Sequence, residues 1–199
     1  MATEGEQPAE PGIRGPWPLA TEQTRAELTA YLGTAADPAL AGKQSLCPAW
    51  TVSQVTAHLA ATFARFADQL VKSRGGDLSR PFAVDELPAE NLRAVERFSG
   101  DPDPALRAEA GRFLALATDP GEMMAHQRGP IPAGLQVLFG LNELAVHHYD
   151  VTAPYGPAYR PPDPVLALLA DMHERVSGLP PGGDVWDRIL RQTGRRGGT

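Results

Sequence analysis

The fold of this chain is decided by the stretch Leu141-Asn-Glu-Leu-Ala-Val-His-His-Tyr-Asp150. It continues an apolar run that begins at Leu135, and Pro132 suits the opening of one helix that carries both segments. On that helix Glu143 and His147 are four residues apart, so they share one face. The same face carries Gln136, Phe139, Gly140, Val146 and Asp150. This face therefore combines apolar residues with a carboxylate and an imidazole.

A carboxylate and an imidazole that point into an apolar interior are costly unless something pairs with them. A divalent metal is one such partner, provided that a third ligand comes from elsewhere in the chain. His58 is the best candidate, because it falls within the apolar stripe of a second predicted helix, at residues 51–73. The residues alone also allow a hydrogen-bonded core histidine at position 58 and a surface ion pair between Glu143 and His147.

The pattern of caps and apolar stripes predicts an all-α fold. Thr51 and Gln54 form a capping box at the start of the second helix. Thr21 and Gly33 are predicted to cap the first helix, and Asp103-Pro104 is predicted to begin the third. The four principal helices, near residues 20–33, 51–73, 104–118 and 132–152, are expected to form a bundle. No convincing alternating strand is found.

Three segments follow from this pattern. Residues 1–18 are rich in proline, glycine and glutamate, so we expect a disordered N-terminal tail that meets the body near Trp17. Residues 19–155 are expected to form the bundle. Residues 156–199 are expected to form a C-terminal helical extension, with one helix opening at Asp163 and another at 184–193. Shorter helical structure is also expected at 88–98.

Composition excludes several classes of function. The chain of 199 residues carries a net charge of −6, and its pI is about 5.3. Binding to nucleic acid or to an anionic membrane is therefore not expected. The single cysteine, Cys47, fits a reducing compartment, and we expect a cytoplasmic protein. A homodimer is considered as an assembly, although no residue specifies one.

Two segments resemble the signatures of a known family. Cys47-Pro-Ala-Trp-Thr-Val-Ser-Gln-Val-Thr-Ala-His-Leu-Ala60 is similar to the N-terminal signature of the mycothiol-dependent maleylpyruvate isomerase family, which belongs to the DinB-like superfamily of metal-binding four-helix bundles. Glu143-Leu-Ala-Val-His-His-Tyr-Asp150 resembles its second signature. The ending Asp184-Val-Trp-Asp-Arg-Ile-Leu-Arg-Gln-Thr-Gly-Arg195 is similar to that of many single-domain members.

The resemblance implies that His58, Glu143 and His147 bind a divalent metal, usually zinc. Two departures stand out. Tyr149 replaces a common tryptophan, and the chain is shorter than the characterised isomerase, which has an additional C-terminal domain. Catalytic residues of that domain are expected to have no counterpart here, which puts maleylpyruvate itself in question as the substrate.

A site with three protein ligands leaves one coordination position open, as in catalytic zinc sites. The resemblance implies that mycothiol or a related small thiol binds there as the thiolate and attacks a small electrophile. Either S-transfer or cis–trans isomerisation would follow. Two alternatives stay open, a metal-dependent hydrolase and a non-catalytic metal-binding or stress-related interaction protein.

Other residues near these motifs have several possible roles. Asp150 either orients a metal ligand through a hydrogen bond or caps backbone amides. Cys47 is a weak candidate for a fourth ligand, and His126 lies in a loop that could border the pocket. His148 points about 100° away from His147 and is interpreted as a packing or surface residue. Arg195 is a candidate to contact an anionic thiol cofactor.

Overall fold

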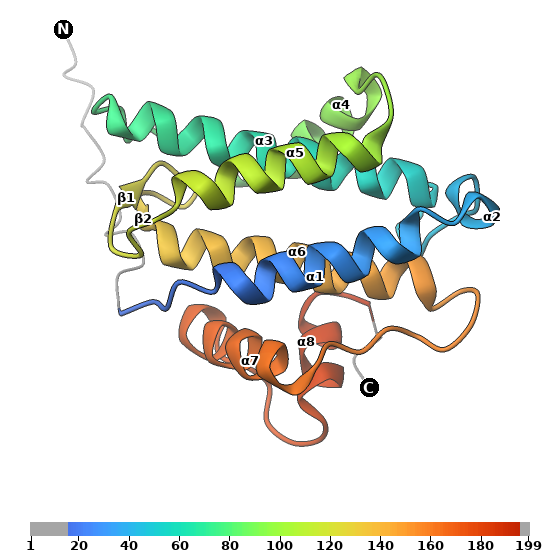
Figure 1. Ribbon diagram of the computed structural model, residues 1–199. Coiled ribbons are helices and arrows are strands. Elements are labelled where there is room, and N and C mark those ends of the chain that lie inside the picture. The colour runs from blue at the N-terminus through green and yellow to red at the C-terminus, as the bar shows by residue number, and fades with distance from the viewer. Residues whose placement is uncertain (1–15, 196–199) are drawn as a thin grey trace, which may run out of the picture.

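The computed structural model describes residues 16–195 and has the predicted all-helical architecture (Figure 1). Its α-helices are α1 (Thr21–Ala35), α2 (Pro38–Ala41), α3 (Val52–Arg74), α4 (Leu87–Arg97), α5 (Pro102–Leu116), α6 (Ala133–Thr152), α7 (Asp163–Ser177) and α8 (Val185–Gln192). A 3-10 turn, Val84–Glu86, precedes α4. One short strand pair, β1 (Met123–Met124) with β2 (Ile131–Pro132), was not predicted.

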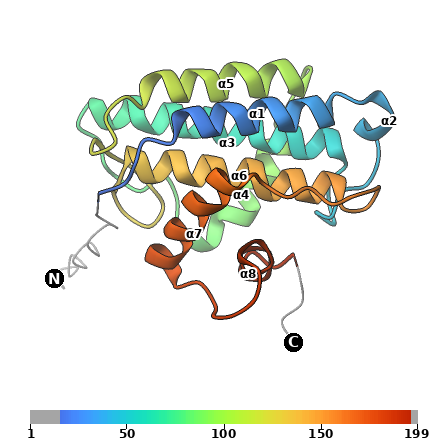
Figure 2. The ribbon, with the colours of Figure 1, turned by 60° about the horizontal axis from the view of Figure 1, so that its bottom comes forward.

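Helices α1, α3, α5 and α6 form the four-helix bundle, which confirms the predicted fold class. In Figure 1, α3 and α5 lie together in one layer and α1 and α6 in the other. Helices α7 and α8 pack below α6, as the turned view in Figure 2 also shows. Their buried residues, among them Leu169, Met172 and Trp186, belong to the same apolar core as those of the bundle. The predicted boundary near residue 155 stays a prediction.

Local sequence explains where α3 begins. The side chain of Thr51 accepts a hydrogen bond from the backbone N–H of Gln54, and the Gln54 side chain accepts one from the backbone N–H of Thr51. This is the predicted capping box. It fixes the first turn of α3, so that His58, less than two turns later, lies on the buried side of the helix.

The predicted caps of two other helices were wrong. Helix α1 follows Ala20 without a side-chain cap, and it continues past Gly33 to Ala35 because Leu32 and Ala35 are buried in the core. Packing there outweighs the helix-breaking tendency of glycine. Helix α5 uses the earlier of two Asp-Pro pairs: Asp101 caps it and Pro102 occupies its first turn, where a missing N–H costs nothing.

A close approach of α3 and α6 depends on Gly140. A Cβ atom at this position would lie 2.9 Å from the Phe63 ring, which is fully buried. Only a residue without a side chain allows the two helices to come this near. The same pair of helices carries the residues predicted to bind metal.

The N-terminal prediction falls mostly outside the described residues, since only residues 16–18 of the expected tail are among them. Within that part, Trp17 is 5% exposed and contributes to the core. The guanidinium of Arg175 lies 5.4 Å from the centre of the Trp17 ring.

Among the described residues, no helix is both long and apolar enough to cross a membrane.

Candidate metal centre

Three of the predicted site residues meet between α3 and α6. His58 comes from α3, and Glu143 and His147 come from successive turns of α6. The Oε2 atom of Glu143 lies 3.4 Å from Nε2 of His58 and 3.5 Å from Nε2 of His147. Both histidines are nearly inaccessible to solvent, whereas the Glu143 side chain is 34% exposed. The three side chains that were predicted to meet therefore lie close together in the structure.

The distances from Glu143 to the two histidines fit a tetrahedral metal ion. Zinc binds imidazole nitrogen and carboxylate oxygen at roughly 2.0–2.2 Å, which places two tetrahedral ligand atoms about 3.4 Å apart. The two distances to Glu143 match this value, and all three atoms lie within 4.8 Å of one another. Two nitrogens and one oxygen are a donor set that zinc accepts, and a fourth position would stay free for another ligand.

The electrostatics of the three groups also suit a cation. Burial alone would raise the pKa of Glu143, but hydrogen bonds with His147 and His58 outweigh it and hold that pKa well below its usual range. Burial would lower the pKa of His147, yet its hydrogen bonds with Asp150, Cys47 and Glu143 raise it. Burial lowers the pKa of His58. The site thus holds a carboxylate beside a positive charge, and a divalent ion can take the place of that proton.

Asp150 holds the far side of the His147 ring. Its Oδ2 atom lies 2.9 Å from Nδ1 of His147, and Arg195 donates from Nη2 to the same oxygen at 2.9 Å. Burial would raise the pKa of Asp150, but His147 and Arg195 lower it to about 2. Of the two interpretations of Asp150, orientation of the imidazole is the one that these contacts favour, because the bond to Nδ1 turns Nε2 of the ring toward Glu143.

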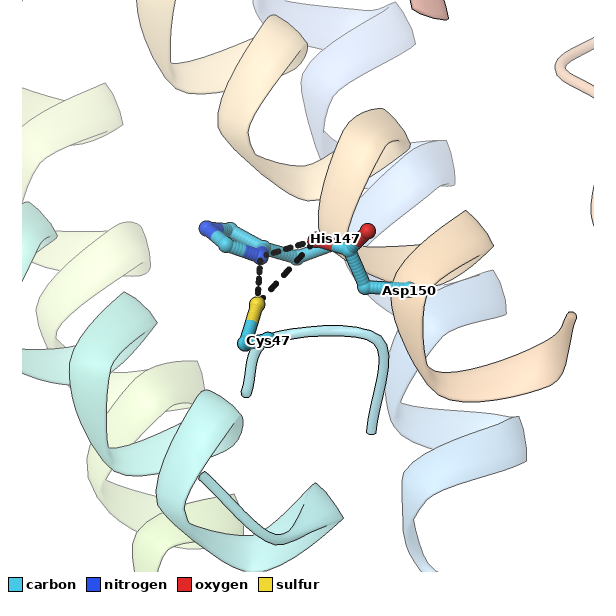
Figure 3. Close-up of side chains that lie close together, drawn as sticks. All are labelled: Cys47, His147 and Asp150. Atoms are coloured by element: carbon cyan, nitrogen blue, oxygen red, sulfur yellow. Dashed lines mark hydrogen bonds and ion pairs between the residues drawn. The ribbon is translucent and has the colours of Figure 1, made fainter. Parts of the chain in front are cut away.

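Cys47 belongs to this far side as well (Figure 3). Its sulfur lies 3.7 Å from Nδ1 of His147 and 3.3 Å from Oδ2 of Asp150. The atom of His147 that faces Glu143 is Nε2, at the opposite edge of the ring. Cys47 is therefore poorly placed to be a fourth ligand of the His58, Glu143 and His147 centre.

The centre opens into two hollows. A cavity of about 240 Å³ runs between α3, α6 and α7, and a second hollow of about 500 Å³ lies beside the 47–50 loop. Four residues line both of them, His58, Leu87, Asn91 and Glu143. The larger hollow also reaches Cys47 and Arg195. Both hollows therefore give access to His58 and Glu143, and the larger one also reaches His147.

Three other aromatic or histidine residues pack near the centre. Trp50 packs against the core with a half-buried ring, which stacks on His58 at 4.8 Å between ring centres and lines the larger hollow. His126 does border the smaller cavity, where its ring stacks on Phe139. His148 is a packing residue, bonded to Glu27 and Thr34 on the other side of α6.

Sequence reasoning did not identify the polar side chains that line the smaller cavity. Arg65 and Asn91 line it and are joined by a hydrogen bond of 3.2 Å. Arg65 lies two turns after His58, a spacing that placed it on the site's side of α3. Gln136 was assigned to the correct face of α6, but nothing in the sequence showed that both polar atoms of its amide would be buried without a partner.

Comparison with known proteins gives results that agree with this geometry. Residues 21–152 match the family model described as the mycothiol maleylpyruvate isomerase N-terminal domain. No curated protein matches the chain. Two solved structures have a similar fold, the mycothiol-dependent maleylpyruvate isomerase (19% identity) and a histidine-to-alanine mutant of it (18% identity), each with a TM-score of 0.59. Each similarity covers 77% of this chain and 68% of the other.

At these identities the solved structures establish the fold alone. The family model carries more weight, because its match contains α1, α3, α5 and α6 together with all three converging side chains. The chain therefore belongs to the family of the mycothiol maleylpyruvate isomerase N-terminal domain.

Proposed function

We propose that this protein is a zinc-dependent enzyme that uses a small thiol of the mycothiol type to isomerise a small electrophile. One observation carries the proposal. Where two hollows meet, the Oε2 atom of Glu143 lies at the distance expected between two zinc ligands from Nε2 of both His58 and His147. A centre with an open position and two approaches suits a reaction between two small molecules.

The proposed metal would supply one function. When bound, zinc lowers the pKa of a coordinated thiol and keeps it as the reactive thiolate. The protein's own residues would prepare the site. Asp150 keeps a proton on Nδ1 of His147, so that Nε2 is free to bind the metal. Trp50, stacked on His58, limits rotation of that imidazole.

The two hollows suggest different occupants. The 500 Å³ hollow is the better match for the bulkier thiol, and Arg195 at its edge offers a cation to polar groups of that molecule. The 240 Å³ cavity is the better match for the small electrophile. Asp150 holds Arg195 in place through a charge-assisted pair, so the residue that orients His147 also fixes this edge.

The reaction type follows from the chemistry of a thiolate and from the family name. A thiolate that adds to a conjugated double bond leaves a single bond free to rotate. Elimination of the thiolate then restores the double bond in the trans form, and the thiol is regenerated. If the anionic adduct instead took up a proton on carbon and were released, the outcome would be S-transfer. We favour isomerisation because the matched family and the similar solved structures carry that activity in their names.

Metal analysis combined with thiol titration tests the proposal. The full chain is expected to bind one zinc ion, and the zinc form is expected to bind mycothiol as a thiolate, seen in the ultraviolet absorbance of the sulfur or with cobalt in place of zinc. His58→Ala should lose most of the zinc and the thiolate signal but keep its helical circular dichroism, since the apolar core holds the bundle. Full zinc occupancy in this variant would mean that the ligand assignment is wrong.

Substrate assays separate the enzymatic alternatives. Turnover of a cis-configured electrophile should require both zinc and the thiol, without consumption of the thiol. Turnover without thiol would indicate a hydrolase, and a chain that binds zinc and thiol but converts no electrophile would indicate a non-catalytic member of the family. The cytoplasmic location and a homodimer stay predictions.

A further inference from the structure

The smaller cavity extends away from the candidate metal centre along the line between α3 and α6. On α3 it passes from His58 to Arg65, and on α6 from Glu143 to Gln136. Both steps are seven residues, which is two helical turns or about 10 Å along each axis. The two helices run in opposite directions, since His58 faces Glu143 and Phe63 lies against Gly140. The same end of the cavity therefore carries Arg65 and Gln136.

Arg65 is a half-buried cation without a direct ion pair. It donates from Nη1 to Oδ1 of Asn91 at 3.2 Å and from Nη2 to Oγ1 of Thr62 at 3.5 Å. Within residues 16–195 no carboxylate forms an ion pair with it, whereas Arg74, Arg112 and Arg160 all have one. A guanidinium withdrawn from water is costly when no negative charge compensates it. The carboxylates of Glu143 and Glu90 act on Arg65 only from beyond ion-pair distance, so its guanidinium still lacks a direct anionic partner.

Gln136 adds unused hydrogen-bonding capacity to the same wall. Its side chain is fully buried, and neither Nε2 nor Oε1 has a hydrogen-bond partner among the described residues. Buried amides of this kind are nearly always paired in folded proteins. A ligand in the cavity would satisfy the Gln136 amide.

We propose that this end of the cavity binds the carboxylate of a small organic acid, with the Arg65 guanidinium as its cationic anchor and the Gln136 amide as a hydrogen-bond donor. A planar guanidinium suits a carboxylate because it can donate two parallel hydrogen bonds to it. Resting on the proposed function, this makes the electrophile a carboxylic acid whose reactive carbon lies toward His58 and Glu143. Arg65 and Gln136 are then residues that select and position the substrate.

Calorimetric titration with two unreactive probes tests this assignment. Succinate carries two carboxylates, and succinamide has a similar shape without charge. The full-length protein should bind succinate at least about tenfold more tightly than succinamide. Arg65→Gln should remove this preference, Arg65→Lys should keep part of it, and the nearly isosteric Gln136→Met should weaken succinate about threefold. The control is Arg97→Gln, an equal loss of charge at an exposed residue of α4 outside the cavity lining, and it should change neither affinity.

Every titration is carried out with and without zinc, because zinc itself attracts carboxylates. The proposal requires that the effect of Arg65 persists in the metal-free protein. It is overturned if Arg65→Gln binds succinate as the wild type does, or if Arg97→Gln weakens binding equally. Should Arg65→Gln fail to fold, Arg65→Lys and Gln136→Met decide, and wild-type binding in both overturns the proposal. A chain without zinc would defeat the proposed function, yet the dependence of succinate binding on Arg65 would still be measurable.

Discussion

His147 and His148 are neighbours in the chain, and each forms a buried pair with an acid, but the two pairs differ in what surrounds them. His148 points toward α1, where its Nδ1 lies 3.2 Å from Glu27, its Nε2 lies 2.8 Å from Thr34, and its ring stacks on Tyr159. His147 points toward His58 of α3. Two residues of its own helix flank its ring: Asp150 lies 2.9 Å from Nδ1, and Glu143 lies 3.5 Å from Nε2.

The two histidines differ in whether their polar neighbours are all paired with one another. Around His148 both ring nitrogens have near partners, and the hydroxyl of Tyr159 donates to the second oxygen of Glu27. This network is closed and ties α1, α6 and the 153–162 connector together. Around His147 the nitrogen and oxygen atoms instead converge at the junction of two hollows. Buried polar groups that complete one another support the fold, whereas groups that share an unfilled point are suited to bind a ligand.

The largest expected effect is the loss of zinc on His147→Ala. Removal of one of three protein ligands should weaken zinc binding roughly a thousandfold, which is about 4 kcal/mol. Competition with a chromophoric chelator measures the affinity. The rise in melting temperature that zinc gives the wild type should vanish with it. A variant that binds zinc within a factor of ten of the wild type would remove His147 from the ligand set.

The matching change on the other side, His148→Ala, should act on stability instead. It deprives the buried Glu27 of its imidazole partner and removes the ring stacked on Tyr159, so the free energy of unfolding should fall by about 3 kcal/mol. Urea denaturation of the metal-free protein measures it, and zinc stoichiometry should stay at the wild-type value. A second change, Glu27→Gln, should recover part of the loss, because an amide needs no counter-charge. Loss of zinc without loss of stability would reverse the roles assigned to the two histidines.

A smaller effect is expected when only the support of His147 is altered. Asp150→Asn keeps the shape of the side chain but removes the charge that faces Nδ1, and it should weaken zinc binding about 10- to 100-fold. Cys47→Ser is the matched control, because Cys47 contacts both His147 and Asp150. It should change zinc affinity less than about threefold. If Cys47→Ser proved the more damaging change, the sulfur would be a metal ligand after all.

Much of the fold was accessible from the sequence because its signals are local. The capping box at Thr51 lies at the start of the segment that it delimits, and α3 has the predicted bounds, residues 51–73, to within about a residue. The end of α1 was not accessible in this way. Gly33 is a local stop signal, but the burial of Ala35 against distant parts of the chain outweighs it. Tertiary packing of this kind is invisible in a short window.

The candidate site, too, was predictable only where the signal was local or came from the family resemblance. Glu143 and His147 could be paired by helical spacing, and the family resemblance supplied His58 from far away in the chain. Neither source could reveal that Arg195 folds back onto Asp150, because that contact joins two distant segments through side chains alone. Arg65 was missed for a related reason. An arginine on a helix is usually solvated, and only the assembled cavity shows that this one is half-buried without an ion pair.

The smallest expected effect concerns His126, a buried histidine outside both acid pairs. Burial, together with the nearby positive charges of Arg128 and Arg65, lowers its pKa to about 4. The unfolded chain takes up this proton near pH 6.5, so between pH 6.5 and 4 the unfolded state binds more protons than the folded state. The stability that His126 contributes is therefore complete above pH 6.5 and is lost as the pH falls toward 4. His126→Gln cannot titrate, so the drop in the free energy of unfolding from pH 7.5 to 5.5 should be about 1 kcal/mol smaller than in the wild type. Urea denaturation of both metal-free proteins at the two pH values measures this, and equal drops would mean that His126 already carries its proton in the folded state at pH 5.5.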